Sequence, residues 1–397
     1  MARFQLGGEI WQIVQTDRVV EITMDRTTKV RRFVSAAQAR ALYDQLVATQ
    51  LAAGFRPIED APPLNRKVKQ LASTGDPRQP QLERAIELDP DDRDAFGVYG
   101  DWLQGQGDAR GEWIALLAAA AREPAKREDG SRGLAHQRAA RCFGTCRAYL
   151  EGVLGRAHVV WRDGFARRLS VASNEALADI FSHPSARFAV QIELVERGPG
   201  FVDALRALAN HAPAALQHVE LLLATQLNEL HVLAPLLPRL RRLTIGPRPI
   251  AGTLGIHGVE LLARASLPAL QRLAVGPFGE QVGEAELRGL FALDAPALTH
   301  LRLRAPAALT AAAVAASPLA SRLQVLELRG PLLPADVTAL LDHRDRFGAL
   351  RELWVGGHGA QLPSALLASL SGIATHVIDI VKETQSALHA RYVPNGE

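Results

Sequence analysis

The stretch from Pro213 to Gly356 repeats one pattern six times. It reads PAALQHVELL (213–222), LPRLRRLTIG (237–246), LPALQRLAVG (267–276), APALTHLRLR (295–304), ASRLQVLELR (320–329) and FGALRELWVG (347–356). The shared leucines are 24 to 30 residues apart, at Leu216, Leu240, Leu270, Leu298, Leu323 and Leu350. A fixed pattern at this period is typical of a solenoid, in which each unit buries its apolar face against its neighbours.

Other segments extend this array and alternate with it. ARRLSV (166–171), FAVQIELV (188–195) and THVIDIV (375–381) read as further strands, so we expect about nine. Helical patterns lie between the strands, as in FVDALRALANH (201–211), GVELLARASL (258–267) and ADVTALLDHRDRFG (335–348). A strand followed by a helix at this period resembles the ribonuclease-inhibitor-like class of leucine-rich repeat. The resemblance implies an α/β solenoid with parallel strands on a concave face and helices on a convex face.

The array departs from that family where each strand ends. The family has an asparagine there, whereas this chain has Gly246-Pro247, Gly276-Pro277 and Gly330-Pro331. An asparagine side chain normally satisfies backbone groups in this turn. We therefore expect the stack to form with less regular curvature.

The residues that flank the middle apolar position of each copy alternate with core positions, so they point away from the core. They make the middle of the concave face basic and its C-terminal end acidic, with an exposed tryptophan. A tryptophan is a common anchor in protein interfaces. An ordinary solvated face is the alternative. The predicted partner-binding residues are Arg242, Arg272, His300, Arg302, Arg304, Arg329, Glu327, Glu352 and Trp354.

Residues 1–62 read as short strands followed by one helix. Arg3-Phe4, Trp11, the stretch from Lys29 to Phe33, and Gly54-Phe55 resemble a WGR domain. The resemblance implies a small α+β module that binds nucleic acid in some members. However, this chain has ITMDR (22–26) where the family has its Trp-Gly-Arg signature. The remaining candidate nucleic-acid contacts are Arg26, Lys29, Arg31 and Arg32, and a solvated basic face is the alternative.

Residues 63–80 are rich in proline and polar side chains, which is typical of a linker. Residues 81–160 predict a helical domain, and residues 161–397 hold the solenoid. DPDD (89–92), YGDWL (99–103) and GDARGEWI (107–114) resemble the repeat-companion domain that often precedes repeats of this kind. That resemblance implies no biochemical activity.

The polar residues of the helical domain invite a metal-site interpretation, but turn and cap chemistry explains them better. Asp101, Asp108, Arg110 and Glu112 are expected to form a cap and ion-pair network. Cys142 and Cys146 lie one helical turn apart, and a zinc site would need two more ligands. The mixed-charge stretch 121–135 is the expected site of proteolysis.

Chain length and net charge place few limits on function. The chain has 397 residues and a formal net charge of +3, so its pI near 9.1 is weak support for a nucleic-acid partner. The sequence shows neither a signal peptide nor a membrane span, and a cytoplasmic protein is expected. We found no catalytic motif, so we expect no enzyme activity, cofactor, metal or small-molecule substrate.

These observations favour a non-enzymatic adaptor, inhibitor or regulatory subunit that holds a protein partner on the concave face. The first alternative is a nucleic-acid-binding protein that uses the WGR-like domain and the basic concave centre. The second is a regulatory subunit that is released by a protease cut between residues 121 and 135.

Overall fold

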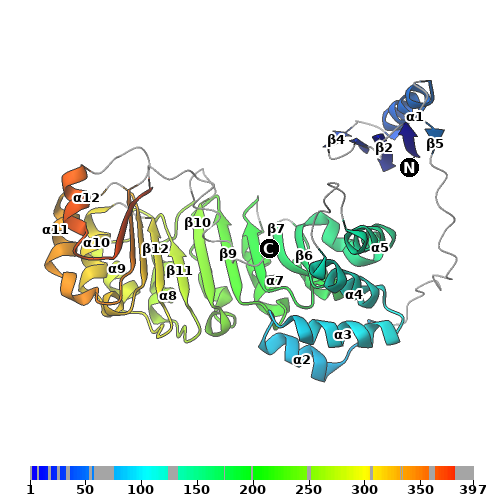
Figure 1. Cartoon of the computed structure of the whole chain (residues 1–397). Helices are drawn as coiled ribbons and strands as arrows, with labels where there is room; N and C mark the ends of the chain where they lie inside the picture. The colour runs from blue at the N-terminus through cyan, green and yellow to red at the C-terminus, as the bar shows by residue number, and fades with distance from the viewer. Residues whose placement is uncertain are drawn as a thin grey trace. The chain divides into compact units, whose positions relative to one another are not determined.

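The structure is a computed structural model, and the described residues form two compact units, Met1–Gly75 and Asp76–Glu397 (Figure 1). It describes residues 2–6, 9–16, 19–24, 27–32, 36–52, 56–57, 76–123, 133–173, 175–197, 200–247, 252–304, 307–330, 332, 334–356 and 363–380. The sequence expectation of a linker over 63–80 falls mostly outside these residues.

The first unit is an antiparallel sheet with strand order β4-β3-β2-β1-β5, and helix α1 packs against β2 and β3. Val20 on β3 and Ala39 on α1 are fully buried, which places the core of the unit between the sheet and the helix. The order of strands followed by a helix agrees with the sequence expectation. The elements are β1 (Ala2–Leu6), β2 (Glu9–Thr16), β3 (Val19–Met24), β4 (Thr27–Arg32), α1 (Ala36–Ala52) and β5 (Arg56–Pro57).

The second unit begins with the helices α2 (Pro80–Leu88), α3 (Arg93–Gly105), α4 (Ala109–Arg122) and α5 (Leu134–Glu151). Asp92 is the N-cap of α3 and accepts hydrogen bonds from the backbone N–H groups of Asp94 and Ala95. Asp108 is the N-cap of α4 and accepts one from the backbone N–H of Arg110. Arg110 is fully buried and donates to both oxygens of Asp108. The expected cap network therefore forms at Asp108 and Arg110, whereas Asp101 and Glu112 are exposed.

A ten-stranded sheet follows the helices, with strands in the order β15 to β6. The nine strands β7 to β15 are parallel, and β6 pairs antiparallel with β7. The strands are β6 (His158–Arg162), β7 (Phe165–Ala172), β8 (Gln191–Val195), β9 (His218–Leu223), β10 (Arg242–Pro247), β11 (Arg272–Val275), β12 (His300–Arg304), β13 (Val325–Arg329), β14 (Glu352–Gly356) and β15 (His376–Asp379). The chain therefore has a mixed α/β, solenoid-like fold.

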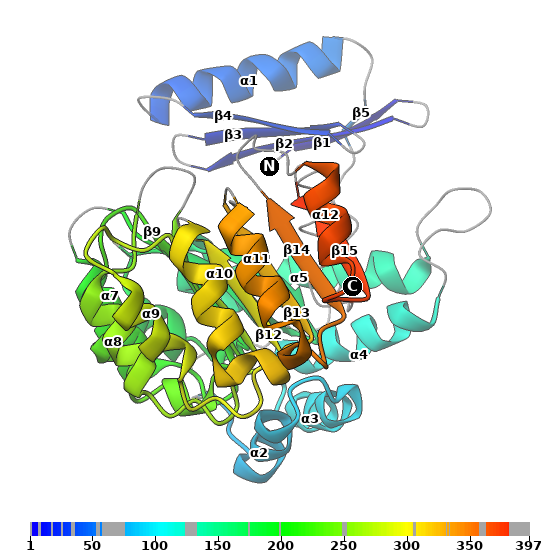
Figure 2. The ribbon, with the colours of Figure 1, turned by 90° about the vertical axis from the view of Figure 1, so that its left-hand side faces the viewer.

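Helices cover one face of this sheet (Figures 1 and 2). They are α6 (Leu177–Ser182), α7 (Phe201–His211), α8 (Ile256–Arg264), α9 (Glu284–Phe291), α10 (Ala307–Ala316), α11 (Pro334–Asp342) and α12 (Ser364–Leu370). One hydrophobic core runs between helices and strands from Leu154 to Ala374. All six skeleton leucines lie in it and are at most 5 % exposed. The connection from β9 to β10 lacks a full helix and contains only the short 3₁₀ turns Leu230–Leu233 and Leu237–Arg239.

A glycine occupies the turn after β11 because no other residue fits there. Gly276 has a φ of 108°, and a Cβ atom on it would lie 2.0 Å from the carbonyl oxygen of Arg304. Gly276 thus lets two neighbouring strand ends approach closely.

The helical region and the repeats share one core within the second unit. Phe165 and Phe188 of the repeat region pack with Phe96 and Tyr99 of α3, in edge-to-face or tilted ring contacts. The sequence division at residue 160 therefore does not coincide with a gap between compact units.

A buried carboxylate joins the same two regions electrostatically. Glu83 on α2 is 2 % exposed and pairs with Arg187, which comes from the repeat region, at 3.1 Å. Tyr99 donates a hydrogen bond to Glu83, and Arg78 pairs with it at 2.6 Å. Burial, followed by the Glu83 charge, raises the pKa of Tyr99 well above its usual value, so its hydroxyl remains a donor.

We expect Glu83→Ala to lower the free energy of unfolding of the second unit by about 3–5 kcal/mol, because it leaves the mostly buried Arg187 guanidinium without this partner. Chemical denaturation of the full chain measures the change. Glu87→Ala is the matched control: Glu87 is on the same helix and pairs with the exposed Arg84, so its loss should cost about 0–1 kcal/mol. Equal effects of the two changes would contradict the proposed role of Glu83.

Candidate partner-binding surface

The face of the sheet opposite the helices, called the open face below, presents side chains in two aligned rows. The parallel register places the first row at Arg168, Gln191, His218, Arg242, Arg272, His300, Val325, Glu352 and His376. It places the second row at Ser170, Glu193, Glu220, Thr244, Ala274, Arg302, Glu327, Trp354 and Ile378. The positions that the sequence predicts to point away from the core therefore do lie side by side on one surface.

Arginines occupy the centre of the first row. Arg242 on β10 and Arg272 on β11 are direct register partners, so their Cα atoms are about one strand spacing, ~4.8 Å, apart. Both side chains are partly exposed. The two guanidinium groups therefore concentrate positive charge at the centre of this row.

The two histidines that flank these arginines are uncharged at neutral pH. Burial, reinforced by Arg242 and Arg272, lowers the pKa of His218 to about 4. Burial and then Arg272 lower the pKa of His300 to about 4 as well. The positive charge of the row from β9 to β12 therefore comes from the arginines, and it stays constant over the physiological pH range.

The acidic residue predicted near the C-terminal end of this face is buried in an ion-pair network. Glu327 is 0 % exposed, and it accepts a 2.6 Å hydrogen bond from Nε of Arg302 on one side and another from Nε of Arg329 on the other. Arg304 faces Arg329 across the strands, and burial, followed by these neighbouring arginines, lowers its pKa. The prediction that Glu327 contributes an acidic contact surface is wrong, because the two arginines neutralise it and cover it.

The prediction of an exposed tryptophan is also wrong. Trp354 lies on the open face, in register with Glu327 and Ile378, but it is only 2 % exposed. It packs in a small cluster with Val325, Ile378 and Ile380. Its indole N–H donates a 2.9 Å hydrogen bond to Glu352. Trp354 therefore stabilises the end of the stack and does not present a free anchor.

Sequence reasoning missed Glu193, which adds to Glu220 an acidic group near the N-terminal end of the face. Glu193 on β8 and Glu220 on β9 are register partners in the second row. Glu193 accepts a 2.6 Å hydrogen bond from Ser170 and pairs with Arg168 at 3.4 Å. The alternation in FAVQIELV could have placed Glu193 on this face. The open face is therefore acidic at β8 and β9 and basic from β10 to β13.

The other predicted contacts are only partly described. Arg26 lies outside the described residues, and Lys29, Arg31 and Arg32 belong to β4, whose backbone pairs antiparallel with β3. Most of the predicted cleavage stretch 121–135 also lies outside them. Glu123, at its start, accepts a 3.1 Å hydrogen bond from the backbone N–H of Ala135 at its end.

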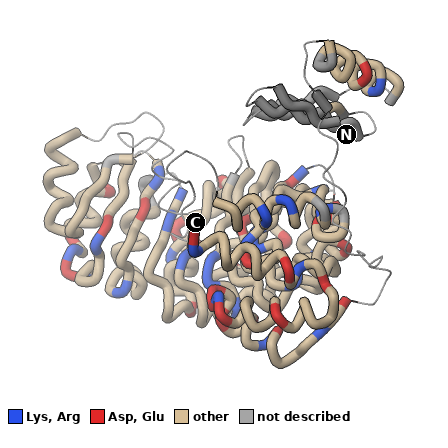
Figure 3. The backbone as a smooth tube through the Cα atoms, turned by 45° about the vertical axis from the view of Figure 1, so that its right-hand side comes forward, with Lys and Arg blue, Asp and Glu red and all other residues tan. Residues whose placement is uncertain are grey.

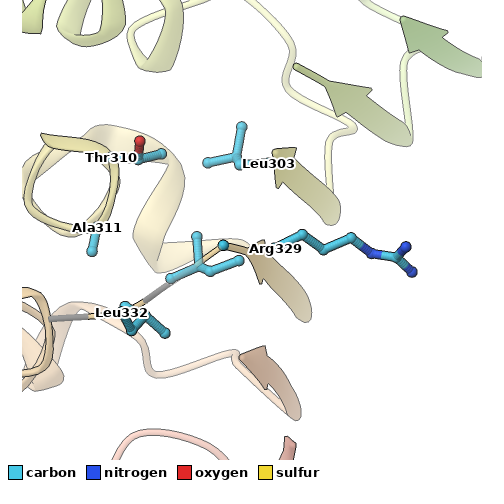
Figure 4. Close-up of a pocket in the computed structure, with 7 residues that line it drawn as sticks. Leu303, Thr310, Ala311, Arg329 and Leu332 are labelled. Atoms are coloured by element: carbon cyan, nitrogen blue, oxygen red, sulfur yellow. The ribbon is translucent and has the colours of Figure 1, made fainter. Parts of the chain in front are cut away.

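A small cavity lies on the helix side of β12 and β13 (Figure 4). Its free volume of about 10 Å³ is that of a single water molecule. The side chain of Arg329 extends away from the other lining residues (Figure 4). The lining residues are Leu303, Thr310, Ala311, Leu328, Arg329, Gly330 and Leu332. This cavity is too small for a metabolite.

The charged residues of the described chain are spread over strands and helices (Figure 3). Within the described ranges, no three His, Cys, Asp or Glu side chains come together as metal ligands. Cys142 and Cys146 are free and partly buried, against Trp113 and Phe143. In the same ranges, no helix combines the length and apolar character that crossing a bilayer requires.

Comparisons with known proteins give no family for this chain. No family model matches it, and no curated protein matches it. A crystal structure of a protein from Bacteroides fragilis aligns with 97 % of each chain, at 16 % identity and a TM-score of 0.36. The description of that structure names no activity or ligand.

We expect acidification from pH 7.5 to 5 to destabilise the second unit partly through His218. In the folded chain this side chain stays neutral down to about pH 4, whereas in the unfolded chain it takes up a proton near pH 6.5. Between these values the unfolded chain binds more protons, so falling pH favours unfolding. His218→Gln should therefore lose less melting temperature than the wild type over this range. Thermal unfolding at both pH values measures the difference.

His257→Gln is the control for this experiment, because His257 is exposed on α8. It should show the same pH dependence as the wild type. If His218→Gln and His257→Gln lose equal melting temperature between pH 7.5 and 5, then His218 is not held neutral in the folded chain.

Proposed function

We propose that the second unit contains a leucine-rich-repeat solenoid of the ribonuclease-inhibitor-like class, and that it holds a protein partner on its open face. In this proposal the protein is a non-enzymatic adaptor, inhibitor or regulatory subunit. Residues 1–62 are a degenerate WGR-like module, and residues 81–160 are a repeat-companion domain. The six buried skeleton leucines and the parallel strand register support the repeat assignment.

The observation that carries the binding proposal is the opposed pair Arg242 and Arg272. The fold places these two permanent positive charges side by side on neighbouring strands. Small residues stand beside them in the second row, at Thr244 and Ala274, so an incoming side chain meets little obstruction there. A surface that concentrates positive charge in this way is complementary to an acidic partner.

The chemistry of the two arginines defines the partner's contact group. A guanidinium donates paired, parallel hydrogen bonds to a carboxylate, and this geometry suits Asp and Glu side chains. Complementary charge also speeds association and rejects basic partners. We therefore expect the partner to present Asp or Glu to the centre of the open face.

We expect Arg272→Glu to weaken the complex by about 2 kcal/mol or more, that is at least roughly thirtyfold in Kd, because it brings like charges together in the interface. Quantitative pulldown from the source cell, with the captured proteins identified by mass spectrometry, finds the partner. Titration of the purified partner then measures the affinity.

The matched control for this substitution is Arg206→Glu. Arg206 is 60 % exposed on α7, on the helix-covered side of the sheet. The proposal is supported if the Arg206→Glu variant captures a protein that the Arg272→Glu variant does not. A partner that both variants hold equally well would place the binding surface elsewhere.

The same arginine pair supports a second candidate function, nucleic-acid binding. Opposed arginines could contact phosphates as well as carboxylates, and such binding weakens steeply as salt concentration rises. In this case the full chain should shift labelled duplex DNA, single-stranded DNA or RNA at low salt and release it at about 200 mM salt. Absence of a shift for all three at low salt eliminates this candidate.

A further inference from the structure

The chain has two cysteines, and the structure brings them together on one face of α5. Cys142 and Cys146 are one helical turn apart, both are partly buried, and neither forms a disulfide. Their side chains pack in the cluster around Trp113 of α4, the helix that lies against α5. All the thiols of this protein therefore lie in one place, at the contact between two helices.

The two thiols contact each other. A hydrogen bond joins the side chains, so their sulfur atoms are neighbours. The Cys142 thiol donates this bond, which lowers the pKa of Cys146 to about 7. The same bond, followed by burial, raises the pKa of Cys142 above its usual value. At neutral pH the pair therefore holds one thiol and a large share of one thiolate, the form of cysteine that binds metals.

The spacing of the pair opposes a disulfide but fits a metal bridge. Side chains four residues apart on a helix have Cβ atoms about 5–6 Å apart, whereas a disulfide needs about 3.8 Å between the same atoms. Closing a disulfide would therefore require α5 to distort between Cys142 and Cys146. Two metal–sulfur bonds of about 2.3 Å in a straight line hold the sulfur atoms about 4.6 Å apart, so a metal bridge leaves the helix intact.

The number and type of ligands decide which metal fits. Within the described ranges, no further side chain joins the two thiols to make a group of three metal ligands. Zinc takes four ligands at a structural site, and calcium and magnesium take oxygen ligands. Soft thiolates select Cu(I), which two facing sulfur atoms can bind in linear coordination. The pair therefore suits a soft monovalent cation.

The charges around the pair also favour a cation. The carboxylate of Glu112 on α4 opposes ionisation of both thiols, and that of Asp108 opposes ionisation of Cys146. A second thiolate alone would add negative charge beside these carboxylates. A bound cation offsets that charge, so the pair gives up its second proton when the metal binds.

We propose that Cys142 and Cys146 form a binding site for Cu(I), which they hold in linear coordination between their two sulfur atoms. Binding forms two copper–sulfur bonds and breaks the S–H bond of Cys142, whose proton passes to solvent. Nothing is oxidised or reduced, because copper enters and stays as Cu(I). The site uses none of the residues of the open face, so it does not depend on the proposed function.

Titration of the reduced full chain with Cu(I) tests the site. Competition with a chromophoric Cu(I) chelator, without oxygen, measures the stoichiometry and the affinity. We expect one Cu(I) per chain. Cys142→Ser and Cys146→Ser should each weaken binding by at least about a hundredfold, because each removes one of two linked ligands. Wild-type affinity in either variant, or no binding by the wild type, overturns the proposal.

A rearranged pair of thiols is the matched control. Cys146→Ser combined with Gly144→Cys keeps two thiols in the chain but places them two residues apart, where helical side chains do not face each other. Gly144 is exposed, and a Cβ atom on it would meet no neighbouring atom within 4 Å, so the helix accommodates the change. This variant should bind Cu(I) as weakly as Cys146→Ser. Binding as tight as that of the wild type would overturn the facing pair as the site.

Two further measurements separate this site from other uses of a thiol pair. One equivalent of Cu(I) should raise the melting temperature of the wild type but not that of Cys146→Ser, because a ligand of the folded chain stabilises it. Zn(II) should bind at least about a hundredfold more weakly than Cu(I), since the pair supplies two of the four ligands that zinc takes. Equal affinity for Zn(II) would overturn linear coordination. Rapid closure of a Cys142–Cys146 disulfide by oxidised glutathione would overturn the spacing argument and assign the pair to redox chemistry.

Discussion

The structure depends on one constraint: a single strand–helix unit of this chain cannot bury its own leucine. Leu240, Leu270 and Leu298 become inaccessible to water because neighbouring units cover them on both sides. Stacking aligns the strands, and alignment sets every other residue on the opposite face. The surface chemistry of the open face is therefore a direct consequence of how the leucines are buried.

A stack of this kind has two exposed ends, and the chain treats them differently. At the N-terminal end, α3 inserts Phe96 and Tyr99 against the first parallel strands, and Glu83 holds Arg187 from the repeat region. At the C-terminal end, Trp354 and Ile380 cover the side of the sheet that elsewhere remains partly open. Both ends use aromatic rings, and the N-terminal end also has a buried ion pair, Glu83–Arg187, whose partners are 104 residues apart in sequence.

The sequence predicts the strands, their number and the composition of the rows, because a period of two residues assigns each side chain to a face. It cannot predict exposure on that face. The sequence alone makes Glu327 a surface acid, but the strand register brings Arg302, 25 residues away in sequence, into hydrogen-bond contact with it. The sequence alone makes Trp354 an exposed anchor, but in the structure Ile378 and Ile380 pack against it. The Glu83–Arg187 pair has no periodic signal at all, because it depends on how the helices dock on the repeats.

Because different contacts close the two ends, we expect the stack to resist force differently at each end. Each unit contacts only its neighbours, so disruption that begins at one end passes along the array step by step. Among the described residues, β15 has four residues and pairs with β14, whereas β7 is flanked by β6 and contacts α3 through Phe165. A pulling force applied at β15 therefore separates the array one unit at a time. A force applied at the helical region must first separate the Phe96–Phe165 contact and the Glu83–Arg187 ion pair.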